Sequence, residues 1–146
     1  MAGNTHRTII MVDDDEDDFF LVKAALEESA LSFEYHLGLL QNGEELMEYL
    51  HHRSRYSDPR LSPRPCLILL DLNMPRKDGR EVLREIKAEP RLSDIPIVVY
   101  TTSSAHEDKR LAEALGVTSF ITKPSTFEEI IEIFKAHANQ WLRRCS

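Results

Sequence analysis

Four apolar runs in this sequence each lead directly into polar residues that could take part in phosphoryl chemistry. Asp13 and Asp14 follow the first run, Asp71 follows the second, Thr101 the third and Lys123 the fourth. Magnesium ions prefer carboxylates, waters and phosphate oxygens as ligands, and a lysine ammonium group is a compact charge that binds phosphate. An aspartate can itself attack a phosphoryl group and form an aspartyl phosphate. These residue types therefore predict a site that holds a divalent cation and a phosphoryl group on a carboxylate.

Each of these residues also has an ordinary structural explanation when it is considered alone. The acidic run 13–18 could be a solvated turn that caps a helix, and Asp71 could cap a turn. Lys123 could be a surface lysine, and Thr101 could simply be a β-branched residue that ends a strand. Two more hydroxyl residues follow Thr101, so composition leaves open which hydroxyl would bind a phosphoryl oxygen. The site is favoured only if all four runs end at the same place in the fold.

The pattern of strands and helices predicts that the fold brings the ends of these runs together. Short apolar runs rich in β-branched residues alternate with segments of helical periodicity, as in parallel sheets with crossover helices. We predict strands at 8–12, 34–40, 66–70, 95–100 and 119–122, and helices at 17–29, 44–52, 80–89, 105–115 and from 125 onward. Right-handed crossovers then give a flavodoxin-like α/β fold, a three-layer α/β/α sandwich with a five-stranded parallel sheet in the order 2-1-3-4-5. In such sheets the ligand site lies beyond the carboxyl ends of the strands, where the polar residues stand.

Two helices carry patterns that predict which of their sides faces the core. In the helix at 17–29 the apolar positions that recur at helical spacing are Phe20, Leu21, Ala24 and Ala25. In the last helix, Ser125 and Glu128 match a capping box. The predicted apolar face of that helix consists of Phe127, Ile130, Ile131, Phe134, Ala138 and Trp141.

Length and composition limit the classes of protein that fit. The 146 residues are enough for one domain, so we expect a single domain at 1–146 and no effector domain. The net charge of −7 disfavours nucleic-acid binding, and no apolar run is long enough to span a membrane. The first seven residues are polar and do not resemble a secretory signal. The two cysteines, Cys66 and Cys145, stand in positions that do not suggest a disulfide, so we expect a cytoplasmic protein with free thiols.

Taken together, the polar residues make this sequence resemble the receiver domains of two-component response regulators over nearly its whole length. The matching elements are Asp13 and Asp14 after the first strand, the segment 71–75 with Asp78 and Gly79 after the third, Thr101 after the fourth, and Lys123 with Pro124 after the fifth. Within that family the chain is similar to the stand-alone regulators paired with bacterial and cyanobacterial phytochrome kinases. This narrower resemblance rests on the segments 71–83 and 86–87, the loop 53–65, the segment 101–103, and a last helix that reaches Trp141 and Leu142.

The resemblance implies a phosphoacceptor and a metal site. Asp71 would accept a phosphoryl group from a sensor histidine kinase, and that kinase would be of the phytochrome type. Asp13, Asp14, Asp71 and the backbone carbonyl of Asn73 would hold Mg²⁺ as the cofactor.

The resemblance also implies a switch. Lys123 and Thr101 would bind phosphoryl oxygens, and Phe120 would swing inward when Thr101 moves toward the phosphate. Thr102 stands where the family often has a small residue. The protein would then be a phosphoacceptor switch that changes its protein contacts, and not an enzyme acting on external substrates.

Two other classes of protein share parts of this pattern. A haloacid-dehalogenase-type phosphohydrolase also uses an aspartyl phosphate on an α/β sheet, but it has a second aspartate two residues after the nucleophile, where this chain has Asn73. A flavodoxin-like flavin carrier needs a phosphate-binding loop after the first strand, and the acids present there would repel the FMN phosphate. The phosphohydrolase remains the alternative to the switch.

The last helix suggests an interface with a second copy of the chain. Ile133, Trp141 and Leu142 are more apolar than a solvated helix end requires, and exposed apolar patches often mark interfaces. We expect a symmetric homodimer through the fourth helix, the fifth strand and the fifth helix. The alternative is that Trp141 packs back on the core.

Overall fold

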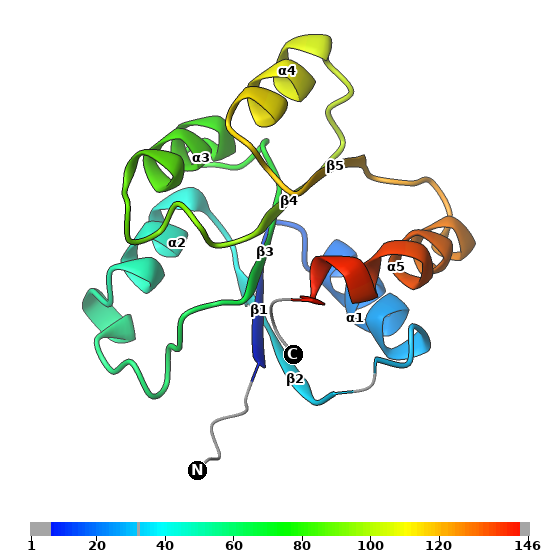
Figure 1. The fold of residues 1–146 in the computed structure, drawn as a ribbon, viewed down its shortest axis with the longest axis horizontal. Coiled ribbons are helices and arrows are strands. Elements are labelled where there is room, and N and C mark those ends of the chain that lie inside the picture. Colours follow the sequence, from blue (N-terminus) through cyan, green and yellow to red (C-terminus); the bar gives the residue numbers. More distant parts are fainter. Residues whose placement is uncertain (1–6, 32, 144–146) are drawn as a thin grey trace.

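The computed structural model describes residues 7–31 and 33–143 and shows one parallel sheet between two layers of helices (Figure 1). The strand order is β2-β1-β3-β4-β5, which confirms the predicted fold. The strands are β1 (Arg7–Val12), β2 (Tyr35–Leu40), β3 (Leu67–Leu70), β4 (Ile97–Thr101) and β5 (Ser119–Thr122). The helices are α1 (Glu16–Glu28), α2 (Gly43–Leu50), the short 3₁₀ helix η1 (Ser54–Tyr56), α3 (Gly79–Ala88), α4 (His106–Ala114) and α5 (Phe127–Trp141).

The two faces of the sheet bury two separate apolar cores. Side chains alternate along each strand, so Ile10 and Val99 pack in the core beneath α2 and α3, whereas Ile9 and Leu69 pack beneath α1 and α5. Figure 1 shows α1 and α5 side by side on one face of the sheet and α2 and α3 on the other. Because β3 and β4 are covered on both faces, their sequences are continuous apolar runs.

The register of the strands brings their carboxyl ends to one edge. The last residues of β1 and β3 pair with each other, so Asp13 and Asp71 are the next residues on neighbouring strands. The last residues of β4 and β5 pair likewise, and the backbone N–H of Lys123 donates to the carbonyl oxygen of Thr101 at 2.7 Å. The four apolar runs therefore end at the same edge of the sheet, as their pattern predicted.

The predicted inner face of α1 is correct at Ala25 but wrong at Phe20 and Leu21. Phe20 is 59% exposed and Leu21 is 37% exposed, whereas Val22, Ala25 and Leu26 are buried. Four successive apolar residues occupy this part of the helix, so the sequence pattern did not define a single face. Packing of α1 against the sheet and α5 decides the rotation of the helix about its axis.

The N-cap of α5 lies one residue later than predicted. The cap is Thr126, whose Oγ1 accepts a hydrogen bond from the backbone N–H of Glu129 at 3.2 Å, so Ser125 and Glu128 are not the capping pair. Phe127 is then the first residue of the helix and is 37% exposed, not part of its buried face. The two candidate pairs have the same spacing, and only the path of the chain into the helix selects one of them.

The exposed apolar patch expected at the end of α5 is not formed by Trp141 and Leu142. Trp141 is 5% exposed and Leu142 is fully buried. The Trp141 ring packs edge-on against Phe134, with 5.6 Å between the ring centroids, because the helix end lies on the core beneath the sheet. The alternative that Trp141 packs back on the core is therefore correct.

The remaining expectations from the sequence concern the chain ends and the thiols. Residues 1–6 and Cys145 lie outside the described residues. Cys66 is disulfide-bonded, so the expectation of a free thiol is wrong for this residue, because sequence positions do not reveal which side chains meet in space. Within 7–31 and 33–143, no helix combines the length and the apolar character that a membrane span requires.

Candidate functional site

Three carboxylates gather at the carboxyl edge of β1 and β3. One carboxylate oxygen from each of Asp13, Asp14 and Asp71 lies within 4.8 Å of the others. Asp13 is 1% exposed and Asp71 is 5% exposed, whereas Asp14 faces solvent. The backbone N–H of Asp15 donates to Oδ1 of Asp13 at 2.9 Å, and that of Asn73 donates to Oδ1 of Asp71 at 3.1 Å. The Oδ2 atoms of the two buried carboxylates are therefore the ones that remain for other partners.

Lys123 brings a positive charge into this cluster. Its Nζ lies 2.6 Å from Oδ2 of Asp18, 2.8 Å from Oδ2 of Asp13 and 3.5 Å from Oδ2 of Asp71. The lysine side chain is only 10% exposed, so solvent screens these ion pairs weakly. In the sequence, Asp18 belongs to the acidic run 13–18 that could cap a helix, and the structure adds this residue to the site.

Burial and the neighbouring lysine act in opposite directions on Asp13. Burial raises the pKa of Asp13 to about 6, and this effect outweighs the nearby ammonium group of Lys123, which lowers the pKa. Burial lowers the pKa of Lys123, but the carboxylates of Asp13 and Asp18 more than compensate and raise it above the usual value for lysine. Near neutral pH the lysine is therefore charged and Asp13 is mostly ionised.

The donor set fits a hard divalent cation. Oδ2 of Asp13 is buried and accepts no hydrogen bond of regular geometry within the described part of the chain, although Nζ of Lys123 lies nearby. A buried carboxylate oxygen without a hydrogen bond is costly, and a cation bound beside it would remove that cost. Asp14 would complete the group from the solvent side, where bound waters could stay.

The raised pKa of Asp13 predicts how metal binding depends on pH. A cation binds the ionised carboxylate, so protonation of Asp13 below a pH of about 6 would compete with a divalent cation. We expect the dissociation constant for Mg²⁺ to be nearly constant above pH 7 and to rise up to about tenfold per pH unit below 6. Isothermal titration calorimetry across this range measures the effect. Asp13→Asn should flatten the profile, and a parent protein whose affinity stays constant down to pH 5 would contradict the prediction.

Thr101 is the last residue of β4, and Phe120 lies within the neighbouring strand β5. Thr101 is fully buried, and its Oγ1 accepts a hydrogen bond from the backbone N–H of Ser103 at 3.3 Å. Of the other hydroxyl residues, Thr102 is exposed and Ser103 donates its hydroxyl to Asp108. Phe120 is half-buried and packs against the core on the α2 and α3 side of the sheet. The hydroxyl of Thr101 is therefore the one placed inside the fold at this edge.

A second polar network, which sequence reasoning missed, joins the loop after β3 to α4. The guanidinium group of Arg80 donates to both carboxylate oxygens of Asp108, at 2.6 and 2.7 Å. It also donates to the carbonyl oxygen of Leu72 and to Oδ1 of Asn73, each at 3.3 Å. Asp108 accepts a further hydrogen bond from the Ser103 hydroxyl at 2.6 Å. No sequence spacing signals this pair, because Arg80 and Asp108 are 28 residues apart.

Loss of the Asp108 carboxylate is expected to destabilise the fold. Asp108 is 7% exposed, and Asp108→Ala would leave the Arg80 guanidinium group without its bidentate partner. We expect the free energy of unfolding to fall by about 2 kcal/mol, since hydrogen bonds to charged groups contribute roughly 1.5–3 kcal/mol. Urea unfolding measures the change. The exposed neighbour Glu107 provides the control, and Glu107→Ala should cost less than about 0.5 kcal/mol. Equal losses in the two variants would contradict this account.

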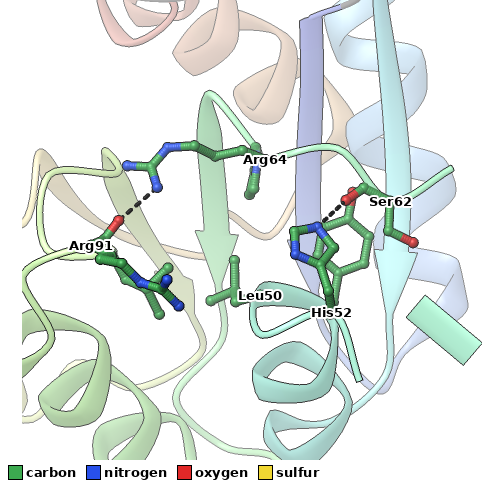
Figure 2. A pocket seen from close by; sticks show the side chains of 8 residues that line it. Leu50, His52, Ser62, Arg64 and Arg91 are labelled. Atoms are coloured by element: carbon green, nitrogen blue, oxygen red, sulfur yellow. Dashed lines mark hydrogen bonds between the residues drawn. The ribbon is translucent and has the colours of Figure 1, made fainter. Parts of the chain in front are cut away.

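A separate hollow of about 270 Å³ lies at the other end of β3 (Figure 2). Its lining residues are Tyr49, Leu50, His52, Ser62, Arg64, Pro65, Arg91 and Leu92. Figure 2 shows Arg64 donating to the carbonyl oxygen of Arg91, at 2.6 Å, and Nε2 of His52 facing the carbonyl oxygen of Ser62, at 2.9 Å. None of these described lining residues is a carboxylate, so the hollow offers no carboxylate ligand for a metal ion.

Comparisons with known proteins identify the family of this chain. Residues 9–135 match the family described as the response regulator receiver domain. Response regulator Rcp1 of Synechocystis sp. is 39% identical over 140 residues, which cover 96% of this chain and 92% of that protein.

Solved structures of similar proteins have the same fold. The phosphorylated cyanobacterial phytochrome response regulator RcpA matches with a TM-score of 0.84 and 38% identity, over 94% of each chain. The Mn²⁺-bound form of Rcp1 matches with a TM-score of 0.83 and 38% identity, over 93% of this chain and 94% of that chain.

Proposed function

The chain belongs to the response regulator receiver family, and we propose that it is a phosphorylation switch that accepts a phosphoryl group on Asp71 from a histidine kinase. One observation carries the proposal. Oδ2 of Asp71 lies 3.5 Å from the ammonium group of Lys123, beside the buried carboxylate of Asp13. A nucleophile, a phosphate-binding charge and a metal ligand are thus combined in one small site.

In the proposed transfer, Oδ2 of Asp71 attacks the phosphorus atom of the kinase's phosphohistidine. The new O–P bond forms as the P–N bond breaks, and the electron pair of the broken bond stays on the departing imidazole. The ammonium group of Lys123 binds one phosphoryl oxygen. The hydroxyl of Thr101 binds another, and to do so it leaves the backbone N–H of Ser103.

We propose Mg²⁺ as the metal of this site. When bound, Mg²⁺ neutralises carboxylates that would otherwise repel the phosphoryl group. The proposed ligands are the carboxylates of Asp13, Asp14 and Asp71 and the backbone carbonyl of Asn73. The Mn²⁺-bound structure of Rcp1 supports a divalent cation in a similar protein.

We propose that a movement of Thr101 changes the protein surface by changing the position of the Phe120 ring. Phe120 pairs with Val99 in the β4–β5 ladder and is half-buried, so its ring lies between the core and the solvent. A shift of Thr101 toward the phosphoryl group would favour a second position of this ring.

Because the chain belongs to the receiver family, it is not a haloacid-dehalogenase-type phosphohydrolase. We propose that the chemistry of the chain is limited to phosphorylation of Asp71 and hydrolysis of the resulting acyl phosphate. Incubation with a labelled histidine kinase and Mg²⁺ tests this, and the label should move to the chain in a hydroxylamine-sensitive form. A protein that takes no label but turns over external phosphoesters steadily would contradict the proposal.

A phytochrome-type kinase is the proposed partner. The similar protein RcpA is a cyanobacterial phytochrome response regulator, which supports this choice. We place both partners in the cytoplasm, where the kinase obtains ATP, and the net charge of −7 supports a partner other than nucleic acid. Transfer from a phytochrome kinase should be faster than transfer from a histidine kinase without a phytochrome sensor, and equal rates would contradict the pairing.

We also propose that α4, β5 and α5 form the contact face for a second copy of the chain. Support comes from the position of Thr101 and Lys123 at the ends of β4 and β5, because phosphorylation there would alter this face. Sedimentation should show a monomer without phosphodonor and a dimer with Mg²⁺ and phosphodonor, and a monomer in both states would eliminate the dimer. Trp141→Ala is not a suitable test of this contact face, because truncating this buried ring would cost about 3–5 kcal/mol of stability.

A further inference from the structure

Lys123 makes its shortest ion pair with a residue that has no role in the phosphoryl chemistry proposed above. Nζ of Lys123 lies 2.6 Å from Oδ2 of Asp18, in the first turn of α1, and donates a hydrogen bond to it. The distance from Nζ to Oδ2 of Asp71 is 3.5 Å, which is beyond a good hydrogen bond. Without a phosphoryl group, the ammonium group is therefore bound more closely by α1 than by the proposed phosphoacceptor.

The two carboxylates closest to Lys123 differ in their access to water. The side chain of Asp13 is 1% exposed, whereas that of Asp18 is 26% exposed. A partly exposed carboxylate can exchange an ion pair for water at little cost, but a buried carboxylate cannot. Asp18 is therefore the partner that a phosphoryl group can displace.

We propose that Asp18 is a positioning residue that competes with the phosphoryl group for the ammonium group of Lys123. This inference rests on the proposed function of Asp71. In the unphosphorylated protein, Asp18 holds Nζ on the side of α1. A phosphoryl group on Asp71 draws Nζ away, and Asp18 turns to solvent. Asp18 thus weakens the hold of the site on a phosphoryl group and keeps the switch reversible.

The neighbouring residue Asp17 provides a matched control. It stands in the same turn of α1 and is exposed, and in the described ranges its carboxylate forms no ion pair. Its backbone N–H donates to the carboxylate of Asp15 at 2.9 Å. Asp17→Asn therefore removes the same charge from the same turn without touching Lys123.

Beryllofluoride, which imitates a phosphoryl group on an aspartate, tests the competition directly. The test is a calorimetric titration of beryllofluoride, at saturating Mg²⁺, into the parent protein and its variants. Asp18→Asn should bind beryllofluoride roughly five- to tenfold more tightly than the parent, because one of the two carboxylates that pair closely with Lys123 is lost. Asp18→Ser, a second uncharged variant that suits a helix N-terminus, carries the same expectation. Asp17→Asn should stay within about twofold of the parent, and Asp18→Glu should return toward the parent value.

A double-mutant cycle separates the lysine contact from a general effect of charge. In a Lys123→Ala background, Asp18→Asn should leave the affinity for beryllofluoride unchanged. The inference would be overturned if both uncharged Asp18 variants bound beryllofluoride with the same affinity as the parent. It would also be overturned if Asp17→Asn raised the affinity for beryllofluoride as much as Asp18→Asn does, or if Asp18→Asn still raised that affinity in the Lys123→Ala background. A parent that binds no beryllofluoride with Mg²⁺ present would contradict the proposed function itself, and the inference with it.

Discussion

Asp71→Asn is expected to take up no phosphoryl group, from a histidine kinase or from acetyl phosphate, in the presence of Mg²⁺. The parent should take up one hydroxylamine-sensitive phosphoryl group per molecule. The amide lacks the anionic oxygen that attacks phosphorus, but it has nearly the shape of the carboxylate and keeps an acceptor for the backbone N–H of Asn73. The loss should therefore be complete without unfolding, and mass spectrometry of the intact protein measures it.

The matched control for this prediction is a carboxylate on the surface. Asp58 lies in the loop 53–65 and pairs with Arg60 at 3.1 Å, away from the acidic edge. Asp58→Asn should be labelled like the parent. Undiminished labelling of Asp71→Asn would reject Asp71 as the phosphoacceptor.

The second large effect expected is a stabilisation of the folded state by Mg²⁺. The proposed ligands are carboxylates that only the folded chain brings together, so a hundredfold excess of Mg²⁺ over its dissociation constant should add about 2.7 kcal/mol. For a domain of this size, that corresponds to a rise in Tm of roughly 5–10 °C. Asp14→Ala should remove most of the rise, because it deletes an exposed ligand without opening the core. Differential scanning calorimetry with and without Mg²⁺ measures both effects.

Glu16→Ala is the control for this measurement. Glu16 is another exposed acid close to Asp14 in sequence, but it is not part of the carboxylate group. Its variant should respond to Mg²⁺ like the parent. If Asp14→Ala also responds like the parent, the metal binds elsewhere.

The fold and the edge that carries the site could be predicted from the sequence alone. Continuous apolar runs such as those of β3 and β4 are stable only when both faces are covered, which requires parallel strands between helices. Parallel strands all end at the same edge, so strand direction alone brings Asp13, Asp71 and Lys123 together. The sequence shows where these residues lie because each of them directly follows its own strand along the chain.

Only the tertiary structure decided which helical residues reach that edge. The sequence marks Asp17 and Asp18 equally as acids at a helix N-terminus, and the rotation of α1 on the sheet selects Asp18 as the partner of Lys123. The same limit applies to Arg80 and Asp108, which meet from two different helices. A short apolar run is enough to predict a strand and the end at which its polar residue lies. The rotation of a helix about its axis, and the ion pairs it forms with distant residues, depend instead on packing over the whole core. The spacing of residues along the chain does not reveal that packing.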